Sequence, residues 1–116
     1  MILGTGIDIV EIERIQKAVE RWEDAFINHI LTPIEIEKSK KFKFPFRHYA
    51  GRFAAKEAIF KAAGIPNLSW HDVTILNDRE GKPYCQFNNN IEFKHRISIS
   101  ISHSRDYAVA SAIVEG

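Results

Sequence analysis

The chain has 116 residues, of which 45% are hydrophobic and 27% charged, with a net charge of +1 and a single cysteine. This composition is typical of a soluble globular protein, and the length predicts one domain over residues 1–116. No apolar run approaches the ~20 residues of a membrane span, no basic segment precedes an apolar N-terminal stretch, and Cys85 has no partner for a disulfide. We therefore expect a cytoplasmic protein without a membrane segment.

The N-terminal half predicts one strand followed by helices. Residues 1–9 are typical of a strand, and their two glycines indicate close approach of another backbone. Apolar residues spaced by three and four predict a helix over residues 10–26. A short helix is expected to begin at Pro33, and the alanine-rich stretch 47–63 predicts a long helix that ends at Gly64.

The C-terminal half predicts antiparallel strands. Residues 73–76 and 84–87 flank NDREGKP, a hairpin-like connection. Isoleucine and serine alternate strictly over residues 97–102, which is typical of a strand buried on one face, and residues 107–114 predict its antiparallel neighbour. Helices early and strands late favour the α+β class, with an antiparallel sheet meander and two main helices.

Charge is unevenly distributed along the chain. Residues 1–37 carry eight acidic and three basic side chains, whereas residues 38–61 carry eight basic and one acidic. A concentrated positive segment in a nearly neutral protein suggests an anionic partner or ligand. For the lysine-rich stretch 38–44 alone, a solvated loop is the simpler explanation.

Glu57 interrupts the apolar stripe of the long helix. A carboxylate on an apolar face is unfavourable unless it is paired or bound to a cation. A surface bridge to Lys61, four residues on, would contribute only ~0.2–0.5 kcal/mol and does not explain the position, so we favour a functional role. Arg52 and Lys56 lie on the same helix, and such cations grip phosphate oxygens while a carboxylate holds a hard metal.

A magnesium site would need a second carboxylate, because Mg²⁺ is usually held by one or two carboxylates plus substrate phosphates. Asp8, embedded in the apolar segment GIDIV, is the best candidate, and a cap of the following helix explains it equally well. His103, at a turn after the isoleucine–serine strand, is suited to bind phosphate or transfer a proton, or is an ordinary turn residue. The sequence contains no Walker loop, dinucleotide fingerprint or zinc-type motif.

Four motifs, taken together and in this order, resemble the holo-acyl-carrier-protein synthases of the 4′-phosphopantetheinyl transferase superfamily. They are GIDIVEI near the N-terminus, RFAAKEAIFKA in the middle, NDREGKP in the hairpin and SISHS near the C-terminus. The resemblance covers nearly the whole chain. It implies the 4′-phosphopantetheinyl transferase fold. It also implies that the protein is a magnesium-dependent enzyme that moves the 4′-phosphopantetheine arm of coenzyme A onto a serine of an acyl carrier protein, in support of fatty acid biosynthesis.

The resemblance also implies roles for individual residues. Asp8 and Glu57 correspond to the magnesium ligands, and Lys61 to a catalytic lysine that contacts the phosphates. The residues that correspond to contacts with coenzyme A are Arg52, Lys56, Lys61, Gly64, Lys82, Pro83, His103 and Ser104. The acceptor of the serine proton stays open between a metal-bound water, Glu57 and His103.

Two interfaces follow from the same resemblance. Arg14 corresponds to a residue of the first helix that meets the acidic carrier protein, and we extend this role to Lys17 and Arg21 because they share its face. In the family, three subunits assemble around a threefold axis and each active site lies between two of them. We therefore expect a homotrimer.

Two other functions fit parts of the sequence. A non-catalytic binder of coenzyme A or nucleotides would leave the acids at Asp8 and Glu57 unexplained. A nucleic-acid-binding module that uses the basic segment 38–61 is weakened by its few aromatic residues and by the acidic first third of the chain. We therefore expect coenzyme A and a carrier protein as partners, and neither a nucleic acid nor a membrane.

Overall fold

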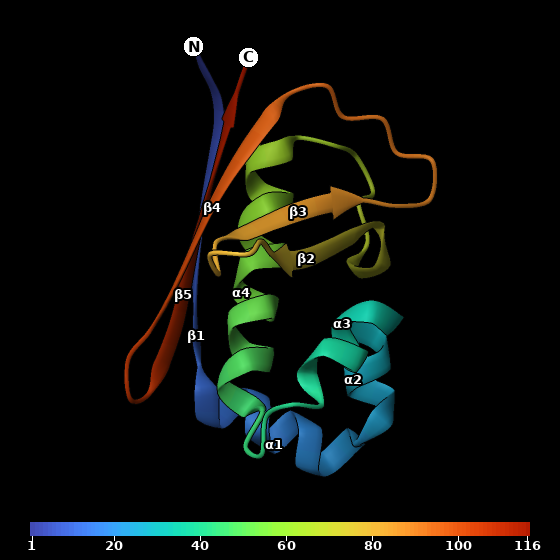
Figure 1. Cartoon of the computed structure of the whole chain (residues 1–116), viewed down its shortest axis with the longest axis vertical. Helices are drawn as coiled ribbons and strands as arrows, with labels where there is room; N and C mark the ends of the chain where they lie inside the picture. The colour runs from blue at the N-terminus through green and yellow to red at the C-terminus, as the bar shows by residue number, and fades with distance from the viewer.

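The computed structural model describes residues 1–116 and confirms the α+β class. The elements in chain order are β1 (Ile2–Glu11), α1 (Ile12–Trp22), α2 (Asp24–Ile30), α3 (Pro33–Ser39), α4 (Phe46–Ala63), η1 (Trp70–Asp72), β2 (Val73–Asn77), β3 (Pro83–Phe87), β4 (Arg96–His103) and β5 (Tyr107–Glu115). Helix α4 runs along the long sheet of β1, β5 and β4, and the hairpin β2–β3 lies on its other side (Figure 1). None of the helices has the length and apolar character that a membrane crossing requires.

Two antiparallel sheets are present, so the prediction of a single meander is wrong. The larger sheet has the order β1-β5-β4, and β2 and β3 form a separate pair. The first strand pairs with the last, with Asp8 opposite Ala110. Pairing between the two ends of a chain cannot be inferred from adjacent segments, because the partner of a strand is set by tertiary packing. The two predicted main helices are α1 and α4, and the shorter α2 and α3 fill the connection between them.

The predicted helix over residues 10–26 is wrong at both ends. Val10 stays in β1, where it is buried and pairs with Ala108. The helix that follows breaks at Glu23, whose φ of 51° separates α1 from α2. The apolar positions of α1 and α2 continue one helical period across the break, which explains why the pattern indicated one unbroken helix.

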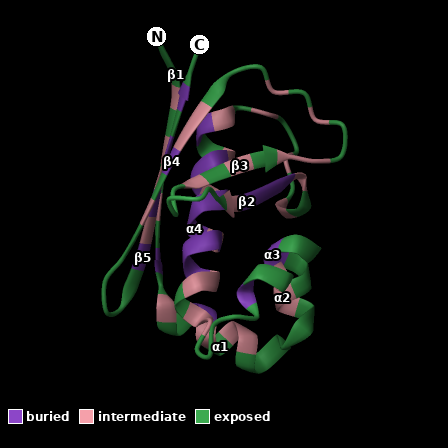
Figure 2. Cartoon of the chain, in the orientation of Figure 1, coloured by how far each residue is buried: buried purple, intermediate pink, exposed green.

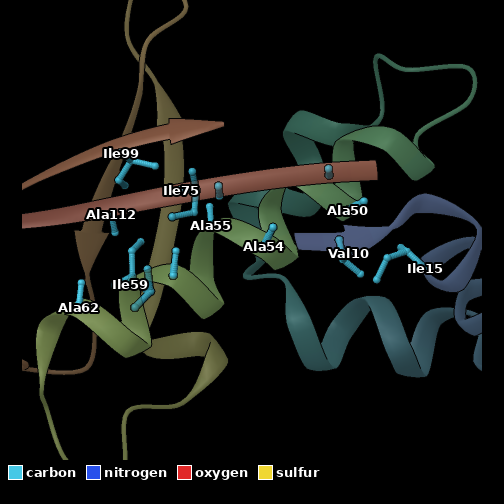
Figure 3. Packing of buried hydrophobic residues seen from close by; sticks show 14 of the residues in the cluster. Val10, Ile15, Ala50, Ala54, Ala55, Ile59, Ala62, Ile75, Ile99 and Ala112 are labelled. Atoms are coloured by element: carbon cyan, nitrogen blue, oxygen red, sulfur yellow. The ribbon is translucent and has the colours of Figure 1, made fainter. Parts of the chain in front are cut away.

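Helix α4 forms the centre of the core through small side chains. Ala54, Ala55 and Ala58 are fully buried against the sheet and the hairpin (Figures 2 and 3). A Cβ atom on Gly4 or Gly6 of β1 would lie 2.1 or 2.0 Å from a carbonyl oxygen of this helix. The predicted close approach of two backbones is thus confirmed, and it presses β1 against α4.

The opposite face of the larger sheet is uncovered, and it is apolar over β1 and β5, whereas β4 presents serines there. Side chains alternate across a strand, so the residues of β1 between those that face α4 point outward. Ile7 and Ile9 are 65% and 63% exposed, and Ile113 of β5 is 36% exposed. An exposed apolar face of this kind on a small protein marks a surface of interaction.

Candidate active site

Three of the predicted residues meet between β1 and α4. Asp8 follows Gly4 and Gly6 on the strand face that is pressed against the helix, and Glu57 and Lys61 lie one helical turn apart on α4. The Nζ atom of Lys61 donates to the carbonyl oxygen of Ile7 at 2.8 Å and lies 3.4 Å from Oδ1 of Asp8. The side chain of Asp8 is 18% exposed and that of Lys61 is 53% exposed, so this carboxylate site is open to solvent.

The structure excludes the two structural explanations for these acids. Asp8 does not cap α1, because it pairs within β1 and the N-cap position belongs to Glu11. Glu57 does not pair with Lys61, since none of the ion pairs in the chain includes Glu57. Glu57 is therefore a half-buried carboxylate without a cationic partner in direct contact.

The two carboxylates repel each other. Burial first, and then the negative charge of Asp8, raise the pKa of the Glu57 carboxyl above its ordinary value, and Lys61 opposes this with a smaller lowering. A cation placed between the two acids would remove the repulsion. Two carboxylates that leave room for waters and substrate phosphates suit Mg²⁺, and no group of three or more His, Cys, Asp or Glu side chains is present to suggest another metal.

A second group of predicted residues lines a cavity of about 650 Å³ between α3, α4, the β2–β3 hairpin and β4. We call this cavity the basic pocket. Its cationic and imidazole side chains are Lys38, Lys41, His48, Arg52, Arg79 and His103. Pro83 also lines it. Such a concentration of donors suits a ligand that carries several phosphate groups.

Arg52 and the two histidines define the electrostatics of the pocket. Arg52 is 8% exposed and donates to Oδ1 of Asn77. Burial, and then the Arg52 and Lys41 charges, lower the pKa of His48 to about 4. Burial and the charge of Arg47 lower the pKa of His103, although its ring nitrogen Nε2 lies 3.1 Å from the Arg47 carbonyl oxygen. Both imidazoles are therefore neutral at neutral pH, and the arginines and lysines carry the positive charge.

Lys56, which was predicted to contact coenzyme A, does not lie in either site. Its side chain is fully buried, and its three ammonium donors go to Glu35 and to the carbonyl oxygens of Ile30 and Trp70. Sequence reasoning also missed Glu35. The signal was there, because Thr32 and Glu35 have the spacing of a capping box, which the structure confirms at the start of α3.

The remaining predicted residues are placed as follows. Gly64 ends α4 with a φ of 67°, Lys82 is exposed in the β2–β3 hairpin, and Ser104 is exposed in the turn between β4 and β5. The three basic residues predicted to face a carrier protein, Arg14, Lys17 and Arg21, are all exposed on α1. Lys17 forms an exposed ion pair with Glu13 at 3.1 Å.

The depressed pKa of His48 predicts a specific pH dependence of stability. The unfolded chain takes up a proton near the ordinary value of 6.5, and the folded chain only near 4, so the free energy of unfolding falls as the pH drops through this window. When the pH is lowered from about 7 to about 5, the free energy of unfolding of a His48→Phe variant should fall by about 1 kcal/mol less than that of the wild type, after discounting for solvent screening. Urea unfolding at both pH values measures this, and parallel losses in the two proteins would contradict it.

Comparisons with known proteins agree with this geometry. The sequence pattern of the 4′-phosphopantetheinyl transferase superfamily matches residues 4–112. A holo-[acyl-carrier-protein] synthase of Geobacillus sp. strain WCH70 is 48% identical over 122 residues, which cover 99% of this chain and 98% of that protein.

Two solved structures share the fold over nearly the full length. The holo-(acyl-carrier-protein) synthase of Bacillus anthracis strain Ames in complex with CoA (3′,5′-ADP) is 40% identical with a TM-score of 0.86, covering 99% of this chain and 97% of that one. The enzyme of Helicobacter pylori in complex with coenzyme A is 35% identical with a TM-score of 0.82, covering 96% and 99%. This chain therefore belongs to the 4′-phosphopantetheinyl transferase superfamily and is an enzyme of the holo-[acyl-carrier-protein] synthase family.

Proposed function

We propose that this enzyme transfers the 4′-phosphopantetheine arm of coenzyme A to a serine of an apo acyl carrier protein, with Mg²⁺ as cofactor and release of adenosine 3′,5′-bisphosphate. The observation that carries the proposal is the repulsion between Asp8 and Glu57 beside Lys61, in a chain that also has a basic pocket. The reaction would serve fatty acid biosynthesis in the cytoplasm, where coenzyme A and carrier proteins are available.

The two sites suit two phosphate-bearing parts of one coenzyme A molecule, the 3′-phosphate and the pyrophosphate. The basic pocket would hold the nucleotide with its 3′-phosphate near Arg52 and His103, and the carboxylate site would face the pyrophosphate. Gly64, Lys82, Pro83 and Ser104 would line the path between them. The relatives from Bacillus anthracis and Helicobacter pylori were solved with coenzyme A or its nucleotide part, which supports this choice of ligand.

The geometry of α4 supports a site shared between subunits. Arg52 and Glu57 are five residues apart, which places them about 140° apart around the helix. One ligand molecule can hardly contact both faces of the same helix. We propose that the basic pocket of one subunit faces the carboxylate site of its neighbour in a homotrimer, with the uncovered face of β1, β5 and β4 buried at the interface.

The reaction is a phosphoryl transfer, in which the protein positions the reacting groups and neutralises the charge on the phosphates. The serine oxygen attacks the phosphorus that bears pantetheine and a new O–P bond forms. The serine hydroxyl gives up its proton, for which Glu57, His103 or a water is the candidate acceptor, and the bond to the bridging oxygen breaks as the bisphosphate leaves with that oxygen. Lys61, whose Nζ donates to a carbonyl oxygen of β1, would place its ammonium group next to the pyrophosphate oxygens. Mg²⁺, held by Asp8 and Glu57, would supply further neutralisation of the phosphates.

The carrier protein would dock on α1. Arg14, Lys17 and Arg21 present positive charge on its exposed surface, and α1 starts directly after the strand that carries Asp8. An acidic docking helix would be steered to this surface and would bring its serine toward the carboxylate site.

The test is to incubate the protein with coenzyme A, Mg²⁺ and an apo acyl carrier protein and to weigh the carrier by intact mass spectrometry. We expect a gain of about 340 Da that requires the metal. The same mixture treated with EDTA should leave the carrier unchanged. Binding of coenzyme A without any gain in carrier mass would instead favour a non-catalytic binder, and capture of nucleic acid that falls steeply with salt would favour the other alternative.

The trimer has its own test. An Ile9→Glu variant places a charge on the uncovered sheet face, so it should elute as a monomer by size-exclusion chromatography with light scattering and should lose transferase activity. Phe44→Glu is a matched control, because Phe44 is 75% exposed and lies outside both the sheet and the lining of the basic pocket. A wild type that is monomeric and fully active would contradict the shared site.

A further inference from the structure

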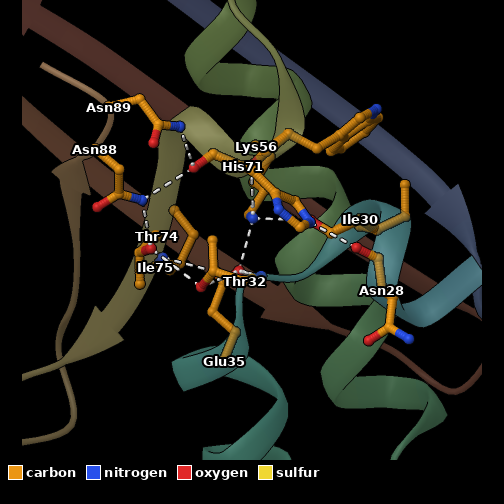
Figure 4. Close-up of polar contacts among 11 residues, drawn as sticks. Asn28, Ile30, Thr32, Glu35, Lys56, His71, Thr74, Ile75, Asn88 and Asn89 are labelled. Carbon is orange, nitrogen blue, oxygen red and sulfur yellow. Dashed lines mark hydrogen bonds and ion pairs between the residues drawn. The ribbon is translucent and has the colours of Figure 1, made fainter. Parts of the chain in front are cut away.

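Glu35 and Lys56 form a fully buried ion pair between α3 and α4 (Figure 4). Glu35 is 1% exposed, Lys56 is 0% exposed, and Nζ of Lys56 lies 2.6 Å from Oε1 of Glu35. The ammonium group also donates to the carbonyl oxygens of Ile30 and Trp70, at 2.8 and 2.9 Å. Lys56 has no donor left for a ligand, so any influence on the reaction must pass through its partners.

The carboxylate of Glu35 accepts four hydrogen bonds, three of them on one oxygen. Besides Lys56, its Oε1 accepts from N and Oγ1 of Thr32 at 2.8 and 3.1 Å, and its Oε2 accepts from N of Ile75 at 2.7 Å. Each carboxylate oxygen offers about two lone-pair sites, so Oε1, which Lys56 contacts, has none left. These bonds fix α3 and β2 to α4, and Glu35 and Ile75 both line the basic pocket.

Arg52 shares that pocket and lies one helical turn before Lys56. Burial lowers the pKa of Arg52, and the charge of Glu35 opposes this. A buried guanidinium and a carboxylate that line one cavity favour a bidentate pair. No hydrogen bond or ion pair joins these two side chains, however, and Arg52 donates to Asn77 instead. The donors on Oε1 of Glu35, Lys56 among them, leave that oxygen no lone pair for Arg52 and hold the carboxylate toward α3 and β2.

We propose that Lys56 is a positioning residue that holds the Glu35 carboxylate away from Arg52 and so keeps the Arg52 guanidinium free for a phosphate of the nucleotide. This inference rests on the proposed function, in which the basic pocket takes the 3′-phosphate end of coenzyme A. The three side chains together carry one unmatched positive charge, and Arg52 is the one that faces the cavity without an anionic partner. Without the ammonium group, Glu35 would turn to Arg52 and compete with the phosphate.

The experiment is a titration of adenosine 3′,5′-bisphosphate into the protein by isothermal calorimetry. Lys56→Met should weaken binding by about tenfold or more, and adding Glu35→Gln to it should restore the Kd to within about threefold of the wild type. Rescue separates positioning from a structural role, because the second substitution returns none of the contacts of the lost lysine. In the transferase assay, the loss in Lys56→Met should appear mainly in the KM for coenzyme A.

Lys40→Met is the matched control, because it breaks an exposed lysine–glutamate pair with Glu37 on the same helix α3. Its Kd should equal that of the wild type. Breaking one side of a buried pair is strongly destabilising, whereas replacing both partners often is not. If Lys56→Met does not fold, the double variant must still bind the nucleotide as the wild type does.

The outcomes distinguish this inference from the function on which it rests. A double variant that binds at least tenfold more weakly than the wild type, or an unchanged Lys56→Met, overturns the positioning role of Lys56. The Arg52→Ala variant should fail to bind adenosine 3′,5′-bisphosphate whether or not Lys56 has the positioning role. If the wild type does not bind the nucleotide, or if Arg52→Ala binds as tightly as the wild type, the assignment of the basic pocket fails instead.

Discussion

Replacing Glu57 by glutamine should lower kcat/KM by about 10³-fold in the presence of Mg²⁺ and should raise the melting temperature of the metal-free protein. The two effects have one origin. In the proposed function the carboxylates of Asp8 and Glu57 would together bind a cation, and without that cation they repel each other. The variant keeps the shape of the side chain and removes one of the two charges. Activity should fall because the phosphates lose a neutralising partner, and stability should rise because a half-buried charge, and with it the repulsion by Asp8, is gone.

The sign of the stability effect follows from the pKa of Glu57. Its folded-state pKa is raised, so near neutral pH the ionised carboxyl is less favourable in the folded than in the unfolded chain. This penalty is present above the folded pKa and disappears as the pH falls through it. The gain in Tm of Glu57→Gln should therefore shrink when the measurement is repeated in acid.

Thermal unfolding with and without Mg²⁺ checks this prediction alongside the transferase assay. Glu92→Gln is the control, because Glu92 is exposed and lies outside both sites, and it should change neither activity nor Tm. An excess of Mg²⁺ should stabilise the wild type more than Glu57→Gln, since a ligand that binds only the folded state adds stability according to its affinity. Equal stabilisation of both proteins would show that Glu57 does not hold the metal.

The carboxylate site could be predicted because its chemistry is visible in the sequence. Asp8 and Glu57 each interrupt an apolar segment, and an acid in such a place is unfavourable unless it is paired or bound to a cation. The sequence alone did not say whether Asp8 capped a helix, since that depends on whether the following helix starts directly after Asp8 or further along the chain. The structure decides it, because β1 continues to Glu11 and keeps Asp8 in the sheet.

Lys56 shows what sequence reasoning could not resolve. Arg52, Lys56 and Lys61 are all cations on one helix, and their spacing alone does not say which of them face solvent. Lys56 can be fully buried only because the fold places the negatively charged Glu35, which is 21 residues away in sequence, next to it. The pairing of β1 with β5 is missed for the same reason, since both contacts depend on segments far apart along the chain.

Gly6→Ala should destabilise the protein by about 3 kcal/mol and abolish transferase activity in what remains folded. An added Cβ would lie 2.0 Å from the carbonyl oxygen of Ala58, and that oxygen belongs to the backbone of α4. A flexible side chain could move aside, but a helix backbone cannot without disturbing its own hydrogen bonds. Strand β1 would have to withdraw from α4 instead.

The activity loss follows from the same displacement. Asp8 lies two residues beyond Gly6 on the same face of β1, so a strand that withdraws from α4 carries Asp8 away from Glu57 and Lys61. Glu92→Ala is the control, because Glu92 is exposed and lies outside the sheets and both sites, and it should change stability by no more than about 0.5 kcal/mol. Urea unfolding and the transferase assay measure both effects. If Gly6→Ala were as stable as the wild type but inactive, the strand could shift at little cost, and the close packing of β1 on α4 would then serve to place Asp8 rather than to hold the fold together.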